Sequence, residues 1–470
     1  MRIYFTKYSK LEEYERHVIQ SAMAVFEFCV ARLGAVGISL MPLLIVYVKE
    51  WRLVHVLLLL WGVCELWFFI YQFKVIHELE ERDVGYWDSG KRAVGIEKLL
   101  EHMGDPANSA EQLLRKWHLE KVESKPCMAH FVNTLVWMFF DKHVENLTLD
   151  EALEAKVMLH KFREKLDIPS YSEAEQASRV KCIRFSVDHL EYVNKAFLFY
   201  LVRVWKNLIL KVISVPRLFM LGYLWMRGFS VCADAGKKHV YWVKAGNGTE
   251  DAVVFSSGIG VGINGYLKMI NDLICRYPNR TIILFETPYI NLQPAASVLS
   301  KGDSLREVDD MFLDLKLDKC TWIGHSYGTV IAGWVVKNRP HYIRKLVLVD
   351  PICFRVWDVS CFKTVFYSPP DSFESNLFWI MFASDPTLAR GISRHVNWFD
   401  IILFPEQIPM PTQIFLAEKD FLLDPTGLHS YLQHRIAKDN LSHIGIDTID
   451  TCHGFFQLFP EFSERIFSAL

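Results

Sequence analysis

The second half of the sequence predicts an α/β fold with a mostly parallel sheet. Its short apolar segments of β type are residues 252–257, 345–350, 412–417 and 444–449. A Gly-x-Ser-x-Gly motif, from Gly324 to Gly328, stands between a further strand and a predicted helix. An acidic residue and then a histidine follow at later strand ends. Strand ends on one edge of a sheet bring their side chains together, so these three groups are expected to meet.

Ser326 lies at the centre of this motif. Four apolar residues of β type precede it, and Tyr327 to Asn338 have the pattern of a helix. A sharp strand-to-helix turn lifts the serine hydroxyl out at the end of the sheet and needs small neighbours, which Gly324 and Gly328 supply. We therefore predict Ser326 as a nucleophile. The alternative is an ordinary turn that happens to carry a serine between glycines.

A nucleophilic serine needs a base, and the base needs an acid that orients it. His453 lies beside a glycine in the loop after the last strand and is the predicted base. Asp420 is the favoured acid over Asp424, because it lies nearer the end of the strand at 412–417. The other candidate acids are Glu418, Asp424 and Asp350.

A glycine-rich loop follows the strand at 252–257 and contains Gly258 and Gly260. Glycines let the backbone turn its N–H groups toward a substrate oxygen. The N–H groups of Ile259 and Tyr327 are therefore the predicted donors of an oxyanion hole. A loop that merely reverses the chain is the alternative, whereas the glycine spacing does not fit a nucleotide-binding loop.

Residues from about 237 to 470 resemble the serine esterases and lipases of the α/β-hydrolase superfamily, with no subfamily indicated. The matching motifs are Ser257-Gly258-Ile259-Gly260, Gly324-His325-Ser326-Tyr327-Gly328, Ala417-Glu418-Lys419-Asp420 and His453-Gly454. The resemblance implies an α/β-hydrolase fold, a triad of Ser326, Asp420 and His453, and no metal or cofactor. Many relatives have His-Gly where this chain has Ser257-Gly258, and this difference bears on the shape of the oxyanion hole.

Residues 352–408 occupy the position of a helical lid in that fold. They are richer in aromatic residues than the whole chain, in which aromatics make up 14%. An apolar cover over the serine suits an acyl chain, although the same side chains could simply pack the cover on the core. The spacing of His395 and Asp400 also occurs in some acyltransferases, which is a weak signal.

Two apolar runs near the N-terminus, Leu33 to Val48 and Leu53 to Phe73, predict membrane-anchoring helices. A spanning helix needs about 20 apolar residues, so the second run is long enough. We expect either a helical hairpin or one span preceded by an interfacial helix, with a buried helix pair as the alternative. Glu65 should then face a partner rather than lipid.

The remaining segments complete a division into four parts, 1–78, 79–191, 192–236 and 237–470. Residues 79–191 are polar and have helical spacing, without evident chemistry. Tyr192 to Ser230 carry basic and long apolar residues but no acidic one, which suits helices at a membrane interface or connecting helices. The ten cysteines are scattered singly, which favours reduced thiols, and the net charge of −2 gives no reason to expect nucleic acid.

These features predict a membrane-attached serine hydrolase that cleaves a lipid carboxylic ester through an acyl-enzyme. The expected partners are a lipid or acyl ester and a membrane, with an intracellular membrane as the expected location. A lipid acyltransferase or a thioesterase with the same triad is the alternative enzyme. A catalytically inactive membrane scaffold is the alternative of another class.

Overall fold

The computed structural model describes residues 52–77, 87–103, 116–117, 128–166, 182–188, 223–232, 240–248, 250–260, 262–291, 299–367, 375, 378–383, 385–395 and 397–470. The chain divides into two compact units, which we describe separately. The first comprises residues 1–80 and 192–223, and the second comprises residues 81–191 and 224–470. The predicted division into four parts stays a prediction.

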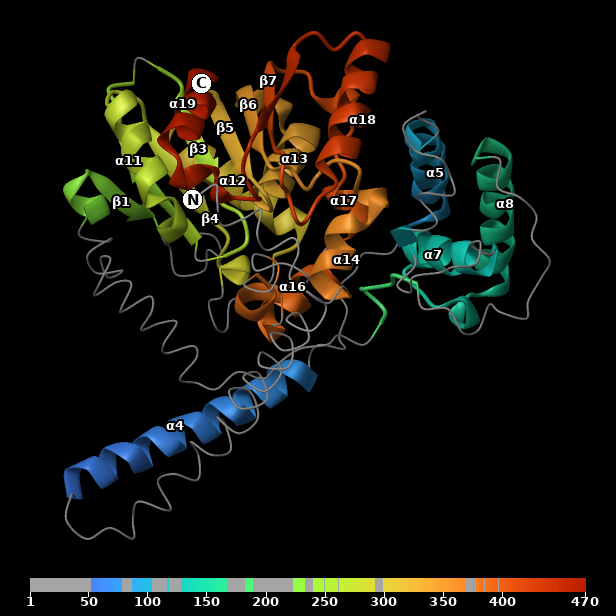
Figure 1. Cartoon of the computed structure of the whole chain (residues 1–470), viewed down its shortest axis with the longest axis horizontal. Coiled ribbons are helices and arrows are strands. Elements are labelled where there is room, and N and C mark those ends of the chain that lie inside the picture. Colours follow the sequence, from blue (N-terminus) through green and yellow to red (C-terminus); the bar gives the residue numbers. More distant parts are fainter. Residues whose placement is uncertain are drawn as a thin grey trace, which may run out of the picture. The chain divides into compact units, whose positions relative to one another are not determined.

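An eight-stranded sheet forms the centre of the second unit (Figure 1). Its strands are β1 (Phe229–Cys232), β2 (Val240–Lys244), β3 (Ala252–Ser256), β4 (Ile282–Glu286), β5 (Cys320–His325), β6 (Ile343–Val349), β7 (Thr412–Ala417) and β8 (Ile444–Ile449). The strand order is β1-β2-β4-β3-β5-β6-β7-β8, and β2 alone runs against its neighbours. This order and the single reversed strand are those of the α/β-hydrolase fold.

The central strands read as continuous apolar runs because both faces of the sheet are covered. Every residue of β3, β4 and β5 is buried. The predicted strands lie within two residues of β3, β6, β7 and β8. Strands β1, β2 and β4 were not among the predictions, and the sheet begins at Phe229, ahead of the predicted boundary at residue 237.

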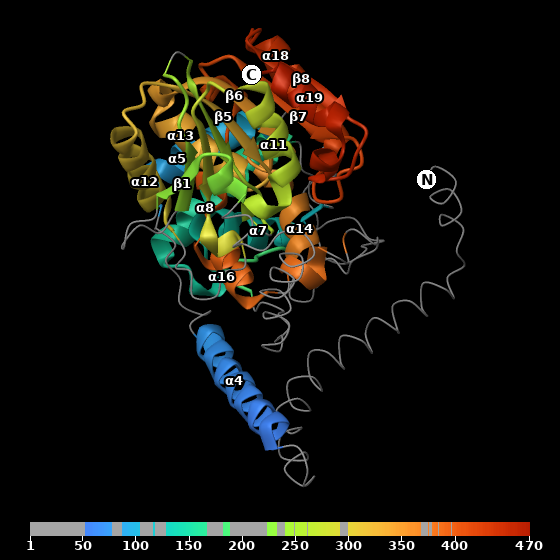
Figure 2. The same cartoon turned by 90° about the vertical axis from the view of Figure 1, so that its left-hand side faces the viewer.

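Helices cover both faces of this sheet. The helices of the second unit are α5 (Ser89–Met103), α7 (Met128–Phe140), α8 (Leu149–Leu166), α11 (Leu267–Arg276), α12 (Lys301–Asp314), α13 (Gly328–Asn338), α14 (Ser360–Phe366), α16 (Pro386–His395), α17 (Trp398–Ile401), α18 (Pro425–Lys438) and α19 (Pro460–Ser468). In Figure 1, α11 and α19 lie to the left of the sheet and α13 and α18 to its right. Figure 2 shows α11 and α19 from the front.

Shorter helical turns fill the connections between these elements. They are η3 (Val144–Asn146), η5 (Gly262–Tyr266), η6 (Pro288–Ile290), η7 (Pro340–Tyr342), η8 (Val356–Asp358), the π-helical turn η9 (Trp379–Ala383), η10 (Pro405–Gln407) and η11 (Phe455–Leu458). Residues 352–408 form the connection between β6 and β7, which we call the insertion. It contains η8, α14, η9, α16, α17 and η10.

The insertion is fastened to the helices that precede the sheet. The indole N–H of Trp398 donates to the carbonyl of Met138 at 2.6 Å, and that of Trp117 donates to the carbonyl of Trp357 at 2.7 Å. The buried guanidinium of Arg394 donates to the carbonyls of three residues in the segment after α8. These residues are Phe185, Ser186 and Asp188. Residues 87–188 are thus packed against the insertion where the structure describes them.

Helix α4 (Arg52–His77) is the described part of the first unit. Glu65 and Phe68 are buried, as expected for Glu65. Large apolar side chains on α4 are 44–65% exposed, namely Val56, Leu59, Leu60, Val63, Leu66, Trp67, Phe69 and Ile70. We call these eight residues the α4 apolar face.

Among the described helices, α4 included, none has the length and apolarity required to cross a bilayer. The span predicted within residues 53–73 is therefore not found, and the polar side chains of His55 and Glu65 interrupt this apolar run. The other predicted membrane segments, 33–48 and 192–222, lie outside the described residues.

Candidate active site

Ser326 occupies the turn from β5 to α13. Its φ of +51° is in the left-handed region, where a residue other than glycine is strained and must be held by its surroundings. The Ser326 N–H donates to the carbonyl of Val349 at 3.0 Å, and the Ser326 carbonyl accepts from the N–H and hydroxyl of Thr329. The strained backbone is therefore fixed on both sides of the serine.

The two motif glycines are required by close backbone approach. A Cβ atom at Gly328 would lie 2.1 Å from the carbonyl oxygen of Ser256, at the end of β3. A Cβ atom at Gly324 would lie 2.9 Å from the carbonyl oxygen of Gly328. The start of α13 thus lies directly against the sheet, which leaves room for hydrogen only.

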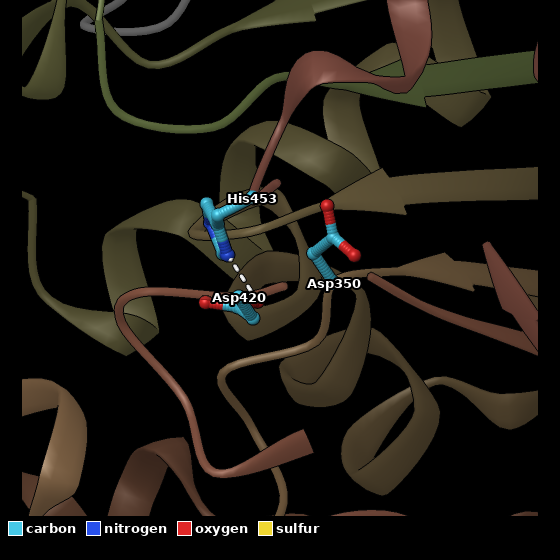
Figure 3. A group of neighbouring side chains, drawn as sticks. All are labelled: Asp350, Asp420 and His453. Carbon is cyan, nitrogen blue, oxygen red and sulfur yellow. Dashed lines mark hydrogen bonds and ion pairs between the residues drawn. The ribbon is translucent and has the colours of Figure 1, made fainter. Parts of the chain in front are cut away.

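The imidazole of His453, in the loop after β8, bridges two of the predicted site residues. Its Nδ1 lies 2.6 Å from Asp420 Oδ2, and its Nε2 lies 2.8 Å from Ser326 Oγ (Figure 3). A carboxylate only accepts hydrogen bonds, so Nδ1 carries the proton. In the neutral ring Nε2 is then the acceptor, and the Ser326 hydroxyl donates to it. All three side chains are buried.

Asp420 is itself held by the backbone that follows it. Its Oδ1 accepts from the N–H groups of Leu422 and Leu423, at 2.8 and 3.0 Å. This turn leaves Oδ2 directed at His453. The position of Asp420 is therefore set by the local chain and is independent of the histidine.

The other candidate acids have different partners. Asp424 caps α18 through the N–H of Gly427 and pairs with Lys116. Glu418 accepts from the hydroxyl of Thr448. Neither of them makes the contact that Asp420 makes with His453.

Asp350 is the third candidate acid, and it lies next to the same histidine. Its two carboxylate oxygens accept from the N–H groups of Ala417 and Gly454, each at 2.8 Å. One ligand atom from each of Asp350, Asp420 and His453 lies within 4.8 Å of the others, an arrangement that could hold a metal ion. Both ring nitrogens of His453 and both oxygens of Asp350 are already hydrogen-bonded, so the cluster is satisfied by protein groups.

The surroundings of His453 favour its protonated form. Burial acts to lower the pKa of His453, but the charge and the hydrogen bond of Asp420 and the charge of Asp350 outweigh it. The pKa of His453 is therefore raised. A ring that gains basicity in this way is suited to take the proton of Ser326 Oγ.

The loop after β3 lies against the serine. A Cβ atom at Gly258 would lie 2.8 Å from the Cβ of Ser326. The N–H of Gly258 donates to the hydroxyl of Tyr266, and the N–H of Gly260, whose φ is +149°, donates to the carbonyl of Ile290. The intervening N–H of Ile259 has no acceptor within the described chain.

The N–H of Tyr327 is the second predicted donor. Tyr327 precedes the first residue of α13, and its N–H likewise has no acceptor among the described residues. The N-terminal end of a helix carries partial positive charge, which favours an anion at this place. Ser257, which replaces the histidine of many relatives, is buried and its hydroxyl has no hydrogen-bond partner in the described part of the chain.

Aromatic side chains of the insertion lie over these loops. The ring of Phe382 would be 3.7 Å from a Cβ atom at Gly260. Phe382 contacts Phe378, which contacts Phe421 after β7, with ring centroids 5.6 and 5.8 Å apart. Phe421 in turn lies 6.0 Å from the ring of His453. An apolar series of rings therefore runs from the oxyanion loop to the acid loop.

The acyltransferase-like spacing is not assembled into a site. The carbonyl of Asp400 accepts from Trp334 and Lys337, and its carboxylate pairs with Lys301. Asp400 thus fastens α17 to α12 and α13. The side chain of His395 lies outside the described part.

No protein-family model matches the sequence, and no curated protein matches it. Solved structures with similar backbones exist, all of low identity. A hydrolase from Pseudomonas aeruginosa PA01 is 14% identical over 51% of this chain and 97% of its own, with a TM-score of 0.38. A membrane phospholipase A is 14% identical over 58% and 96%, with a TM-score of 0.37. The naproxen esterase of Bacillus subtilis is 16% identical over 51% and 90%, with a TM-score of 0.38.

Proposed function

We propose that this α/β-hydrolase is a serine hydrolase that cleaves a carboxylic ester of a lipid while attached to a membrane surface. The observation that carries the proposal is the imidazole of His453, hydrogen-bonded on one side to Ser326 and on the other to Asp420. This arrangement activates a hydroxyl and supports the cation that forms when the ring takes its proton.

The reaction follows from these contacts. Ser326 Oγ attacks the ester carbonyl as its proton passes to Nε2 of His453, while Asp420 holds the ring and its positive charge. The N–H groups of Ile259 and Tyr327 donate to the oxyanion. His453 then protonates the leaving alcohol. Water attacks the acyl-enzyme, gives its proton to His453, and releases the acid and free Ser326.

The aromatic series of the insertion supports a lipid substrate. Phe378, Phe382 and Phe421 offer an apolar surface between the two loops that flank Ser326. An acyl chain gains from leaving water at such a surface, whereas a sugar or a peptide would lose hydrogen bonds to water there. In this proposal the insertion acts as the lid of the fold.

The α4 apolar face supports attachment to a membrane. Eight large apolar side chains on one helix would place a large apolar area in contact with water unless lipid covers it. The proposed attachment is interfacial, with α4 lying in the surface of the bilayer. In the second unit, Trp225 and Met226 are also highly exposed, and tryptophan favours the interface between lipid and water.

Labelling with a fluorophosphonate probe, followed by a panel of lipid esters, tests the proposal. The wild type should label and release fatty acid from at least one ester, and Ser326→Ala should do neither. Ser463→Ala is the matched control, because Ser463 is another buried serine but lies in α19. Labelling retained in Ser326→Ala would remove Ser326 from the mechanism.

The same experiment separates the alternatives. An inactive scaffold would leave the wild type unlabelled. A thioesterase or an acyltransferase would label, but it would act on thioesters or only when an acyl acceptor is added.

A further inference from the structure

We propose that Tyr266 and His325 are positioning residues that hold the oxyanion loop, residues 258–260, against Ser326 through a buried chain of hydrogen bonds. The inference rests on the proposed function, because it concerns the same reaction. Neither residue touches the serine hydroxyl, so each acts through the backbone N–H groups that would bind the oxyanion.

The chain begins at the loop and runs to the motif histidine. The N–H of Gly258 donates to Tyr266 Oη at 3.1 Å, and Tyr266 Oη lies 2.7 Å from His325 Nδ1. Tyr266 and His325 are 5% and 4% exposed, so water does not compete for these bonds. Since Tyr266 Oη accepts from Gly258, its single hydrogen is directed to His325. Nδ1 of His325 is then an acceptor, and the neutral ring carries its proton on Nε2.

The far side of the His325 ring faces the loop of the base. Its Nε2 lies 3.7 Å from Asp350 Oδ2, too far for a direct hydrogen bond but close enough for attraction. The same oxygen accepts from the N–H of Gly454, next to His453. Burial lowers the pKa of His325 despite the nearby carboxylates of Asp350 and Asp420, and His453 adds to the lowering. A neutral ring is what the acceptor role requires.

These contacts determine which N–H group is available to substrate. The N–H of Gly258 is used by Tyr266, so that group cannot serve the oxyanion. Fixing the peptide before Gly258 limits the orientation of the next peptide and of the Ile259 N–H. The fit is tight, since a Cβ atom at Gly258 would lie 2.8 Å from His325 Nδ1. The oxyanion loop is therefore packed on the histidine as well as bonded to it through Tyr266.

Tyr266→Phe tests the proposal, because it removes one oxygen and leaves the ring. Ile259 N–H is displaced rather than lost, so kcat on an ester substrate should fall by about 10- to 100-fold with KM within about twofold of wild type. Tyr431→Phe is a matched control. Tyr431 is also buried and its hydroxyl lies 2.9 Å from Nδ1 of another histidine, His102. This control should change the melting temperature to a similar extent and leave kcat unchanged.

Two substitutions of His325 examine the other end of the chain. His325→Asn keeps an acceptor near the position of Nδ1 and should retain most of the wild-type kcat. His325→Leu has no acceptor and should match Tyr266→Phe. The double variant Tyr266→Phe/His325→Leu should be no worse than either single variant, because both break the same chain.

A wild-type kcat in Tyr266→Phe, an equal loss in Tyr431→Phe, or equal losses in His325→Asn and His325→Leu would overturn the inference. If Tyr266→Phe does not fold, the comparison of the two His325 variants decides. Failure of the proposed function is a separate result, because the wild type would then not label with fluorophosphonate.

Discussion

Asp350 places a carboxylate oxygen within 4.8 Å of a ring nitrogen of His453, although Asp420 is the residue that binds the ring (Figure 3). The charge of Asp350 contributes to the raised pKa of His453. The histidine thus stands beside two carboxylates, of which one orients it and both favour its cation. This relationship distinguishes the roles of two acids that the sequence left as competing candidates.

The first prediction concerns the pH dependence of hydrolysis. His453 must be neutral to act as a base, so kcat/KM should rise as pH rises through its pKa. Asp350→Asn removes one negative charge and should lower that pKa, which moves the acidic limb of the profile to lower pH. Glu418→Gln is the control, because Glu418 binds Thr448 and is exposed. An acidic limb that stays in place or moves to higher pH in Asp350→Asn would show that this charge does not reach His453.

The second prediction concerns the orienting acid. Asp420→Asn should reduce kcat by a factor on the order of 10⁴, because an amide favours the wrong tautomer of the ring. Asp424→Asn is the matched control in the same loop and should cost less than about tenfold, since Asp424 binds Lys116 and caps α18. Steady-state kinetics on one ester decides. If Asp424→Asn were the more damaging of the two, Asp420 would lose its assigned role.

The third prediction uses two glycines of one helix. Gly328→Ala places a Cβ atom 2.1 Å from the carbonyl oxygen of Ser256, so α13 must move and shift Ser326. We expect kcat to fall by at least about 100-fold, since small displacements of a catalytic group have large effects. Gly333→Ala lies further along α13, where the nearest atom would be 3.8 Å away. It should raise the free energy of unfolding by about 0.5–1 kcal/mol and leave kcat unchanged.

The fourth prediction concerns the attachment of the insertion. Arg394→Ala would leave three carbonyls that it now binds without their donor, and the side chain is buried. The free energy of unfolding should fall by about 2–4 kcal/mol, as measured by denaturant melting. Arg306→Ala is the control, because the side chain of Arg306 is 72% exposed and pairs with Asp303 on the surface. That variant should change stability by less than about 1 kcal/mol. Equal effects would mean that Arg394 does not fasten the insertion.

The fifth prediction concerns the α4 apolar face. Val63→Lys/Trp67→Lys places two charges one helical turn apart on this face and should reduce flotation of the full-length protein with anionic liposomes by about tenfold or more. Leu149→Lys/Leu153→Lys is the matched control, since these residues are equally spaced and exposed on α8. Both variants carry the same added charge, so electrostatic attraction to the liposomes is alike. Loss of flotation in the control alone would move the proposed membrane contact from α4 to α8.

The parts of the site that could be predicted are those that short segments specify. The turn around Ser326 depends on two glycines within two residues of it. Asp420 depends on the backbone N–H groups of Leu422 and Leu423, so its position too is a local matter. His453 could be placed because it follows the last strand.

The parts that could not be predicted depend on residues far apart in the chain. Tyr266 and His325 are 59 positions apart, and no spacing rule joins them. Arg394 reaches residues more than 200 positions away. Strands β2 and β4 were missed although their apolar, β-branched runs carried a usable signal, whereas β1 is only four residues long. The predicted span was drawn from apolar length alone.

The order in which the chain visits its two units has a topological consequence. The chain leaves the first unit after residue 80, returns to it at residue 192 and leaves it again after residue 223. Three covalent crossings therefore join the unit that carries α4 to the unit that carries the triad. A single proteolytic cut at any one crossing would leave the two units on a common chain. A protease that nicks one crossing would change the pattern on a denaturing gel without freeing the catalytic unit.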